Sequence, residues 1–349
     1  MAVREMKWVI MLAAGSLAAI AGPRTIAAQD KVFNLKNIPA PGTVTDMSAD
    51  KVMLETPTGT RTFETNEITR ITYGEEPREM AKIRDNLRDA NYEAALSDLK
   101  SLDPASVNRE AVRQEIIYLR AMCEARIALA SGGKREEALN NLQNFFKGNA
   151  GFYRFYEGAE LLGDLASAMG DYGQAVRFYT ALGKAPWPDY KLRANVLEAR
   201  ALAAQGKFAE AQERYEAVIG NPESSADANR QKMLATVGKA VCLNQGGKTD
   251  EAQKILEDLI KNNDSKDSRL FGRAYNALGA CYLRAKRPKE ALIQYLHVHL
   301  MFYGEPDTHA EALHHLVKLW TEMQKSDRAI EMRAILVEQY GGSVWAKGV

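Results

Sequence analysis

The sequence of 349 residues is poor in cysteine and holds only Cys123, Cys242 and Cys281. An odd and sparse set of cysteines excludes a disulfide framework, and its spacing matches no zinc-binding or catalytic motif. Each cysteine falls in a predicted helix beside Ala, Leu or Tyr. We therefore expect three small buried hydrophobic side chains, with one chance disulfide as the alternative.

An excess of either charge is also missing. The chain has 46 basic and 45 acidic side chains, with a formal net charge of +1. This balance gives no basis for expecting a nucleic acid or an anionic membrane as partner. The sequence contains no Gly-rich phosphate loop, no Ser-His-Asp signature and no paired-Cys metal motif, so we expect no catalytic residues and no cofactor.

Beyond residue 28 the chain lacks a hydrophobic run that would span a bilayer. Before it, Arg4 and Lys7 precede an apolar stretch over residues 8–21, and small residues follow. This pattern predicts a signal peptide over residues 1–28, cleaved near Ala28, with an uncleaved N-terminal anchor as the alternative. We expect an exported protein of the periplasm or cell envelope, without an integral membrane span in the mature chain.

Residues 29–76 predict a small β-rich module of four or five strands, because stretches rich in Thr, Val and Ile alternate there with turn signals. The clearest strands are 43–47, 51–56, 61–65 and 68–73. Five basic and seven acidic side chains over 31–76 leave the module without the positive charge that phosphate contacts need. A sheet of this size needs a partner surface, which the first helices of the following array are placed to supply.

Seven alanines recur through residues 77–349 in similar surroundings, at spacings of 36 to 43 residues. They are Ala95, Ala138, Ala175, Ala211, Ala252, Ala291 and Ala329. A period in this range predicts a stacked array of helix pairs. One pair alone buries too little apolar surface to be stable, so the pairs must stack. Arrays of this kind present a long curved surface and bind other molecules.

The third unit shows the pattern most clearly. Ala159, Leu162, Gly163 and Ala166 form one stripe of a first helix, and Gly170-Asp171-Tyr172 ends that helix. Ala175, Tyr179 and Leu182 then form a stripe on a second helix. Small residues let the two helices approach closely, and the tyrosine fills the gap toward the next unit. Leu278-Gly279, Tyr282, Ala291 and Tyr295 repeat this arrangement.

These motifs resemble those of the tetratricopeptide repeat family over residues 78–346, although the unit here is nearer 39 residues than 34. The resemblance implies a mostly α fold: a right-handed α-solenoid of about seven helix pairs. The β-rich module in front resembles the SH3-like or Sm-like modules of exported bacterial proteins. We expect the extra residues to lengthen loops or first helices. In the last unit Arg333 replaces the usual aromatic or aliphatic residue, which fits a terminal repeat with a wetter outer face.

The resemblance also implies a peptide-binding groove, because the first helices of that family line the concave face beside the small-residue stripe. Carried over by position, the exposed groove residues are Glu157, Glu160, Asp164, Arg193, Arg200, Arg273, Asn276 and Arg284, with Val196 and Leu283 among them. Such a groove runs from an acidic to a basic stretch and suits a charged peptide. The alternative is an ordinary solvated face.

All five histidines fall between His297 and His315. Glu311 stands four residues before His315 and can share its helix face, but the zinc-protease arrangement of two histidines flanking a glutamate is absent. We therefore expect no metal, with a metal-dependent activity around residues 297–315 or a pH-sensitive patch as alternatives. The leading prediction is a non-catalytic scaffold for a protein or peptide partner. A structural subunit of an envelope or secretion assembly, with possible self-association, is the rival.

Overall fold

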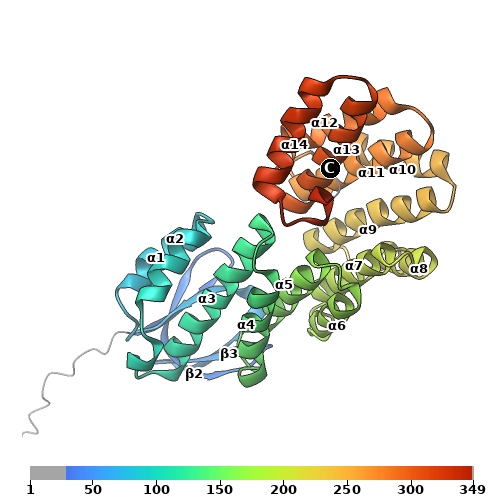
Figure 1. Cartoon of the computed structure of the whole chain (residues 1–349). Helices are drawn as coiled ribbons and strands as arrows, with labels where there is room; N and C mark the ends of the chain where they lie inside the picture. Colours follow the sequence, from blue (N-terminus) through green and yellow to red (C-terminus); the bar gives the residue numbers. More distant parts are fainter. Residues whose placement is uncertain (1–28, 348–349) are drawn as a thin grey trace, which may run out of the picture.

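The computed structural model describes residues 29–347, so the expected leader at residues 1–28 lies outside the described part. Over the described range, five strands are followed by seven consecutive pairs of α-helices (Figure 1). The pairs are α1 (Glu79–Arg88) with α2 (Tyr92–Ser101), α3 (Glu110–Ser131) with α4 (Arg135–Gly148), α5 (Phe155–Ala168) with α6 (Tyr172–Leu182), α7 (Pro188–Ala204) with α8 (Phe208–Ile219), α9 (Ala226–Gln245) with α10 (Thr249–Asn262), α11 (Ser268–Arg284) with α12 (Pro288–Met301), and α13 (Pro306–Glu322) with α14 (Ser326–Tyr340). Within residues 29–347, none of these helices has the length and apolar character needed to cross a membrane.

The strands form one antiparallel sheet in the order β4-β3-β2-β1-β5. They are β1 (Asp30–Asn34), β2 (Pro39–Met47), β3 (Lys51–Thr56), β4 (Gly59–Glu64) and β5 (Ile68–Thr72). The stretch from Pro39 to Gly42, expected to precede a strand, is the first half of β2 and pairs with β1 alone. Prolines fit there because one side of this stretch has no ladder that needs an N–H donor.

Gly42 lies where β2 passes from β1 to β3, and a side chain at this position would overlap the backbone of Glu55.

The β1 strand is the one that sequence patterns did not single out. It carries Asp30, which is 1% exposed. The Asp30 carboxylate accepts hydrogen bonds from the Arg109 guanidinium at 2.5 and 2.6 Å, from Val44 N at 2.7 Å and from Gly74 N at 3.0 Å. A buried carboxylate so fully satisfied fixes the sheet to the start of α3.

The sheet shares its core with the first helices, which confirms the expectation that they support it. Val32 and Ile71 of the sheet belong to one buried cluster with Met80 and Ile83 of α1 and Ile116 of α3. Hydrogen bonds extend the contact to later units. They join Arg154 Nη2 to Thr69 O at 2.8 Å, Tyr156 Oη to Asp50 Oδ1 at 2.8 Å and Trp187 Nε1 to Glu64 Oε2 at 2.8 Å. The sheet therefore lies against the N-terminal ends of α3, α5 and α7.

The seven alanines all lie in second helices, and their exposures run from 0% to 7%. Four residues after each of the first six alanines stands a side chain that is at most 3% exposed, a tyrosine or a leucine. In three places such a tyrosine faces a glycine of a first helix: Tyr179 faces Gly163, Tyr215 faces Gly238, and Tyr295 faces Gly279. Arg333, the counterpart in the last unit, is exposed, as expected of a terminal repeat.

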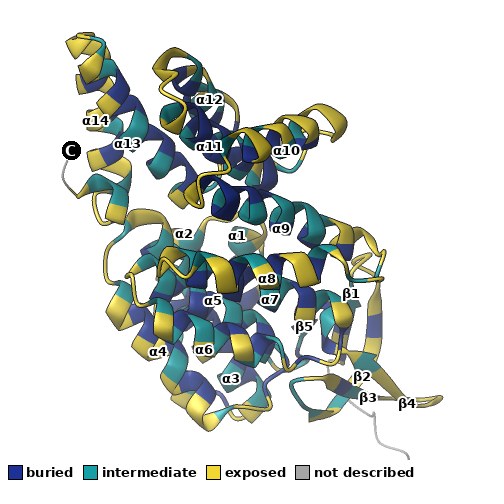
Figure 2. Cartoon of the chain, turned by 90° about the vertical axis from the view of Figure 1, so that its right-hand side faces the viewer, coloured by how far each residue is buried: buried dark blue, intermediate teal, exposed yellow. Residues whose placement is uncertain are grey.

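Long first helices, one of the two sources that the sequence left open, contribute to the long repeat period. Helix α3 has 22 residues and α9 has 20, whereas α2 has 10. Figure 2 shows the first helix α11 largely buried between α10 and α12, while the second helices α8 and α10 show long exposed stretches.

Cys123, Cys242 and Cys281 lie buried and free in first helices. Burial raises the thiol pKa to about 12 for Cys123 and about 11 for the other two.

We predict that Gly163→Ala lowers the free energy of unfolding by about 1–3 kcal/mol, because the new methyl group would overlap the Tyr179 ring. Gly173→Ala is the matched control, since its nearest neighbour would be Asp171 Oδ1 at 3.6 Å. The control should leave the stability unchanged or slightly raised. Urea denaturation followed by circular dichroism measures both variants. Equal stabilities for the two would contradict the role assigned to Gly163.

Candidate functional site

Two cavities lie along the inner face of the first helices. The first, here the sheet-side cavity, has a volume of about 320 Å³ and lies between the sheet and the starts of α5 and α7. The second, here the central cavity, has a volume of about 480 Å³. It lies at the C-terminal ends of α3, α5 and α7, opposite the N-terminal parts of α11 and α13. These volumes fall in the range of sites that hold small ligands or short peptide segments.

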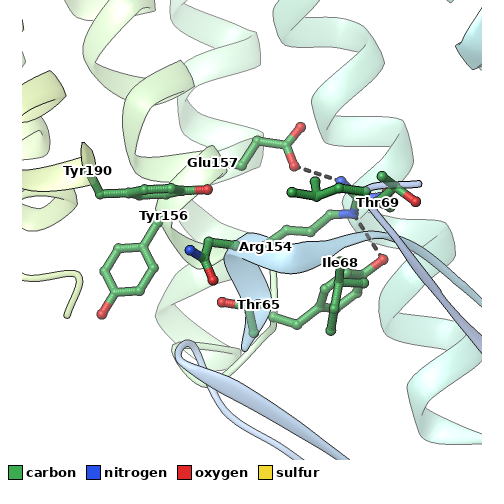
Figure 3. Close-up of a pocket in the computed structure, with 10 residues that line it drawn as sticks. Thr65, Ile68, Thr69, Arg154, Tyr156, Glu157 and Tyr190 are labelled. Atoms are coloured by element: carbon green, nitrogen blue, oxygen red, sulfur yellow. Dashed lines mark hydrogen bonds and ion pairs between the residues drawn. The ribbon is translucent and has the colours of Figure 1, made fainter. Parts of the chain in front are cut away.

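Arg154 organises the sheet-side cavity. Its guanidinium donates to Glu157 at 2.7 Å, to the Tyr153 hydroxyl at 2.9 Å and to Thr69 O at 2.8 Å (Figure 3). Although burial acts in the opposite direction, Arg154 holds the pKa of Glu157 below its usual value. Tyr190 from α7 lies beside Glu157 and completes this wall. The cavity is thus aromatic and polar, with its charges already paired.

The middle of the inner face carries two cross-helix ion pairs. Glu160 of α5 pairs with Arg193 of α7 at 3.1 Å, and Asp164 pairs with Arg200 at 3.4 Å. Asp164 also accepts a hydrogen bond from the Tyr179 hydroxyl at 2.8 Å. The acidic stripe of one first helix therefore lies directly beside the basic stripe of the next. The expected separation into an acidic and a basic end does not occur here, because neighbouring first helices are adjacent in space.

The central cavity brings together residues from nine helices and the C-terminal segment. Asp164, Arg200 and Arg273, all predicted as groove residues, line it. So do Arg126, Arg135, Arg269, Glu305 and Asp307, which sequence reasoning did not select. Arg269 stands four residues before Arg273 on α11, so helical spacing alone was enough to find it. The others come from elements that meet only when the array curves.

Most of the predicted groove residues are half-buried, and two of them are fully buried. Asn276 is 2% exposed, and its Nδ2 donates to Thr308 O at 2.9 Å and to Glu311 Oε2 at 3.0 Å. Val196 is 7% exposed. The prediction of exposure for both was wrong, because the next first helix packs over these positions. Burial, with the Asp307 charge as a further cause, raises the pKa of Glu311 to about 7.

Arg284 is exposed but lies outside the lining of the central cavity. Its guanidinium donates to the side chain of Gln245 at 3.3 Å and to the Gln245 carbonyl at 3.4 Å. It occupies the same face of α11 as Arg273, near the opposite end of the helix. Leu283 beside it is partly buried.

The five histidines serve packing and hydrogen bonding. His297 stacks on Tyr275 and His315 on Tyr295, with ring centroids 4.7 and 4.5 Å apart. His299 Nδ1 and His309 Nε2 are 2.9 Å apart, and His309 Nδ1 lies 2.8 Å from the Tyr340 hydroxyl. Burial lowers the pKa of His309 to about 4. Between residues 29 and 347, no group of three or more His, Cys, Asp or Glu side chains is arranged to hold a metal ion.

The last residues of the array close it onto its second unit. We call the segment 342–345 the C-terminal clasp. Arg135 Nη1 donates to Gly342 O at 2.9 Å and to Ala168 O at 2.9 Å. Gly132, with φ of +77°, ends α3, and a side chain on it would lie 2.5 Å from Gly342 Cα. Trp345 Nε1 donates to Asp307 at 3.2 Å, so the clasp forms one wall of the central cavity. In Figure 1 the red C-terminal unit accordingly lies close to the green helices of the second and third units.

We predict that Gly342→Ala opens the clasp, because its methyl group would overlap the backbone of Gly132. Small-angle X-ray scattering should show a larger radius of gyration, and hydrogen exchange should increase at the α3–α4 turn. Gly148→Ala is the control, since a side chain there meets no atom within 4 Å among the described residues. Unchanged scattering and exchange in Gly342→Ala would contradict this assignment.

Comparison with known proteins supports the repeat assignment at its centre. A family model described as tetratricopeptide repeat matches residues 196–248 and 243–300. No curated protein sequence matches the chain.

Solved structures extend the likeness to most of the array. A tetratricopeptide repeat protein from Parabacteroides merdae is 16% identical and has a TM-score of 0.51, over 75% of this chain and 92% of that chain. NprR in complex with its cognate peptide NprX is 13% identical with a TM-score of 0.53, over 73% of this chain and 75% of that one. The apo quorum sensor NprR from B. thuringiensis is 10% identical with a TM-score of 0.50, over 74% and 85%. At such identities the likeness concerns the fold alone. Residues 196–300 therefore match tetratricopeptide repeats, and the helical array as a whole has the fold of that family.

Proposed function

We propose that this protein is a non-catalytic scaffold of the cell envelope that holds a protein or peptide partner along the inner face of its array. The observation that carries the proposal is the presence of two cavities, the sheet-side cavity and the central cavity, at the two ends of the first helices α5 and α7. Their walls combine aromatic rings with charged side chains held by ion pairs, a combination that binds extended polypeptide. The tetratricopeptide fold is generally an interaction scaffold, and one structure with the same fold is described in complex with a peptide.

The envelope location rests on the sequence alone, on the signal-peptide pattern over residues 1–28. An exported scaffold without a catalytic constellation fits that location. The partner is a protein or peptide of the same compartment.

We predict that a photo-reactive phenylalanine analogue placed at Tyr190 or Tyr172 captures a partner in the native cell. Tyr190 lines the sheet-side cavity and Tyr172 lines the central cavity, so the two positions test both ends of the inner face. The same analogue at Glu213, exposed on the second helix α8, is the control. Mass spectrometry of the adducts identifies the partner and the contact. Adducts from the Glu213 position alone would contradict a role for the inner face.

A second candidate function is a structural subunit that associates with copies of itself. The last two second helices carry exposed apolar side chains that favour it: Ile293 (50% exposed) and Leu300 (67%) on α12, and Ile330 (64%) and Val337 (53%) on α14. Apolar side chains grouped on an outer face are typical of association surfaces.

We predict that, if the second function holds, light scattering after size-exclusion chromatography gives a mass that rises with concentration. Leu300→Glu should then reduce that mass to one chain, because a charge on the α12 surface opposes apolar contact. A monomer at every concentration would remove the structural candidate and leave the peptide-binding one.

A further inference from the structure

The central cavity holds more positive than negative charge. Five arginines line it, against three carboxylates. The arginines are Arg126, Arg135, Arg200, Arg269 and Arg273, and the carboxylates are Asp164, Glu305 and Asp307. Such a balance, inside a chain of net charge +1, concentrates positive potential at one place.

Each of the three carboxylates already has a partner. Asp164 pairs with Arg200 at 3.4 Å, and Glu305 pairs with Arg269 at 3.0 Å. Asp307 accepts the indole hydrogen bond of Trp345 at 3.2 Å. Two of the three carboxylates are therefore neutralised by arginines, and Asp307 is the one lining carboxylate without an ion pair among the described residues, against three arginines without one. Arg135 is engaged by the carbonyl groups of Ala168 and Gly342.

Arg273 and Arg126 are the two arginines of the lining that form neither a hydrogen bond nor an ion pair with the described residues. The Nε of Arg273 is buried without a partner. Burial, followed by the charges of Arg200 and Arg269, lowers the pKa of Arg273 to about 10, so it remains a cation at neutral pH. Arg273 is half-buried overall, and a partly desolvated cation without an ion pair favours the binding of an anion.

Aromatic rings also line the central cavity. Tyr92, Tyr172, Tyr340 and Trp345 line the same cavity from α2, α6, α14 and the C-terminal clasp. Aromatic walls hold the backbone and methylene groups of a peptide, while a guanidinium fork matches the two oxygens of a carboxylate. A volume of about 480 Å³ accommodates a short extended segment.

We propose that the central cavity is a binding site for an acidic peptide segment, with the Arg273 guanidinium as the group that pairs with its carboxylate. Arg126, which also lacks an ion pair among the described residues, adds to the positive field on the opposite wall. This inference rests on the proposed function and narrows it to a ligand class. In this assignment Arg273 of α11 binds the ligand carboxylate, and the ion-paired side chains of α5 and α7 form a supporting wall.

The test uses the full mature chain and three fluorescent probe peptides at low salt. Acetylated hexaglutamate amide carries side-chain carboxylates only. Acetylated hexaglutamine with a free C-terminus carries one terminal carboxylate, and acetylated hexaglutamine amide carries none. Fluorescence anisotropy should show that a carboxylate-bearing probe binds more tightly than the neutral amide. The affinity for that probe should fall as the salt concentration rises. The first two probes separate side-chain from terminal carboxylates as the recognised group.

Arg273→Gln should weaken binding of the carboxylate probe by at least about tenfold, the usual effect of losing a charged hydrogen bond. Arg284→Gln is the matched control, because it removes the same charge from the same helix outside the cavity, and it should bind as the unchanged protein does. Arg273→Lys should restore part of the affinity. Without peptide, Arg273→Gln should melt at the same or a higher temperature, since it removes an uncompensated cation. If Arg273 instead stabilised the fold, the substitution would lower the melting temperature.

Equal affinities for the neutral and the carboxylate probes, or an Arg273→Gln variant that binds the acidic probe unchanged, would overturn the acidic-ligand assignment. Photo-adducts at Tyr190 and Tyr172 in the native cell would then still support peptide binding by the inner face. The absence of those adducts would overturn the broader proposal as well, so the two failures are distinguishable.

Discussion

Close approach of two helices at a residue without a large side chain is the constraint on which this structure depends. In each unit an alanine of the second helix is buried against the first helix. At Gly163, Gly238 and Gly279 the approach is closer still, because a tyrosine ring occupies the space that a β-carbon would need. The small residue and the ring act as a complementary pair. Together they set the separation of the helices, and repeated along the chain they set the curvature of the array.

Curvature in turn decides which charges meet. Consecutive first helices place Glu160 beside Arg193 and Asp164 beside Arg200, so most charge on the inner face is neutralised locally. In the central cavity, where α11 lies opposite α5, that neutralisation is incomplete, and Arg273 and Arg126 have no ion pair among the described residues. A residual charge on a neutralised surface is more selective than a uniformly charged wall, because it favours one position along the bound chain.

The local architecture was predictable because it depends on the spacing of residues that lie close together in the sequence. The alanine spacing placed every second helix, and the stripe of Ala159, Leu162 and Gly163 gave the register of α5. Burial of the cysteines and exposure of Arg333 followed from the same helical positions. The β-rich character of the first segment was equally visible in its alternation of Thr, Val and Ile with turn residues.

The long-range features were not predictable by the same means. Asp30 looks like an ordinary surface carboxylate until Arg109, 79 residues later, folds against it. Asn276 sits on a face that the family pattern leaves open, and only the packing of α13 buries it. The set of arginines in the central cavity depends on the sum of small rotations between units, which no single motif encodes. For that reason the sequence identified the individual residues Asp164, Arg200 and Arg273 without showing that they share a cavity.

The contact between Gly132 and Gly342 gives the array a mechanical character. An open solenoid of stacked helix pairs stretches and bends as a spring, with the strain shared among its units. Here a latch of backbone contact and the Arg135 hydrogen bonds joins the last unit to the second. Tension on the ends therefore loads the latch before it loads the helix stacks.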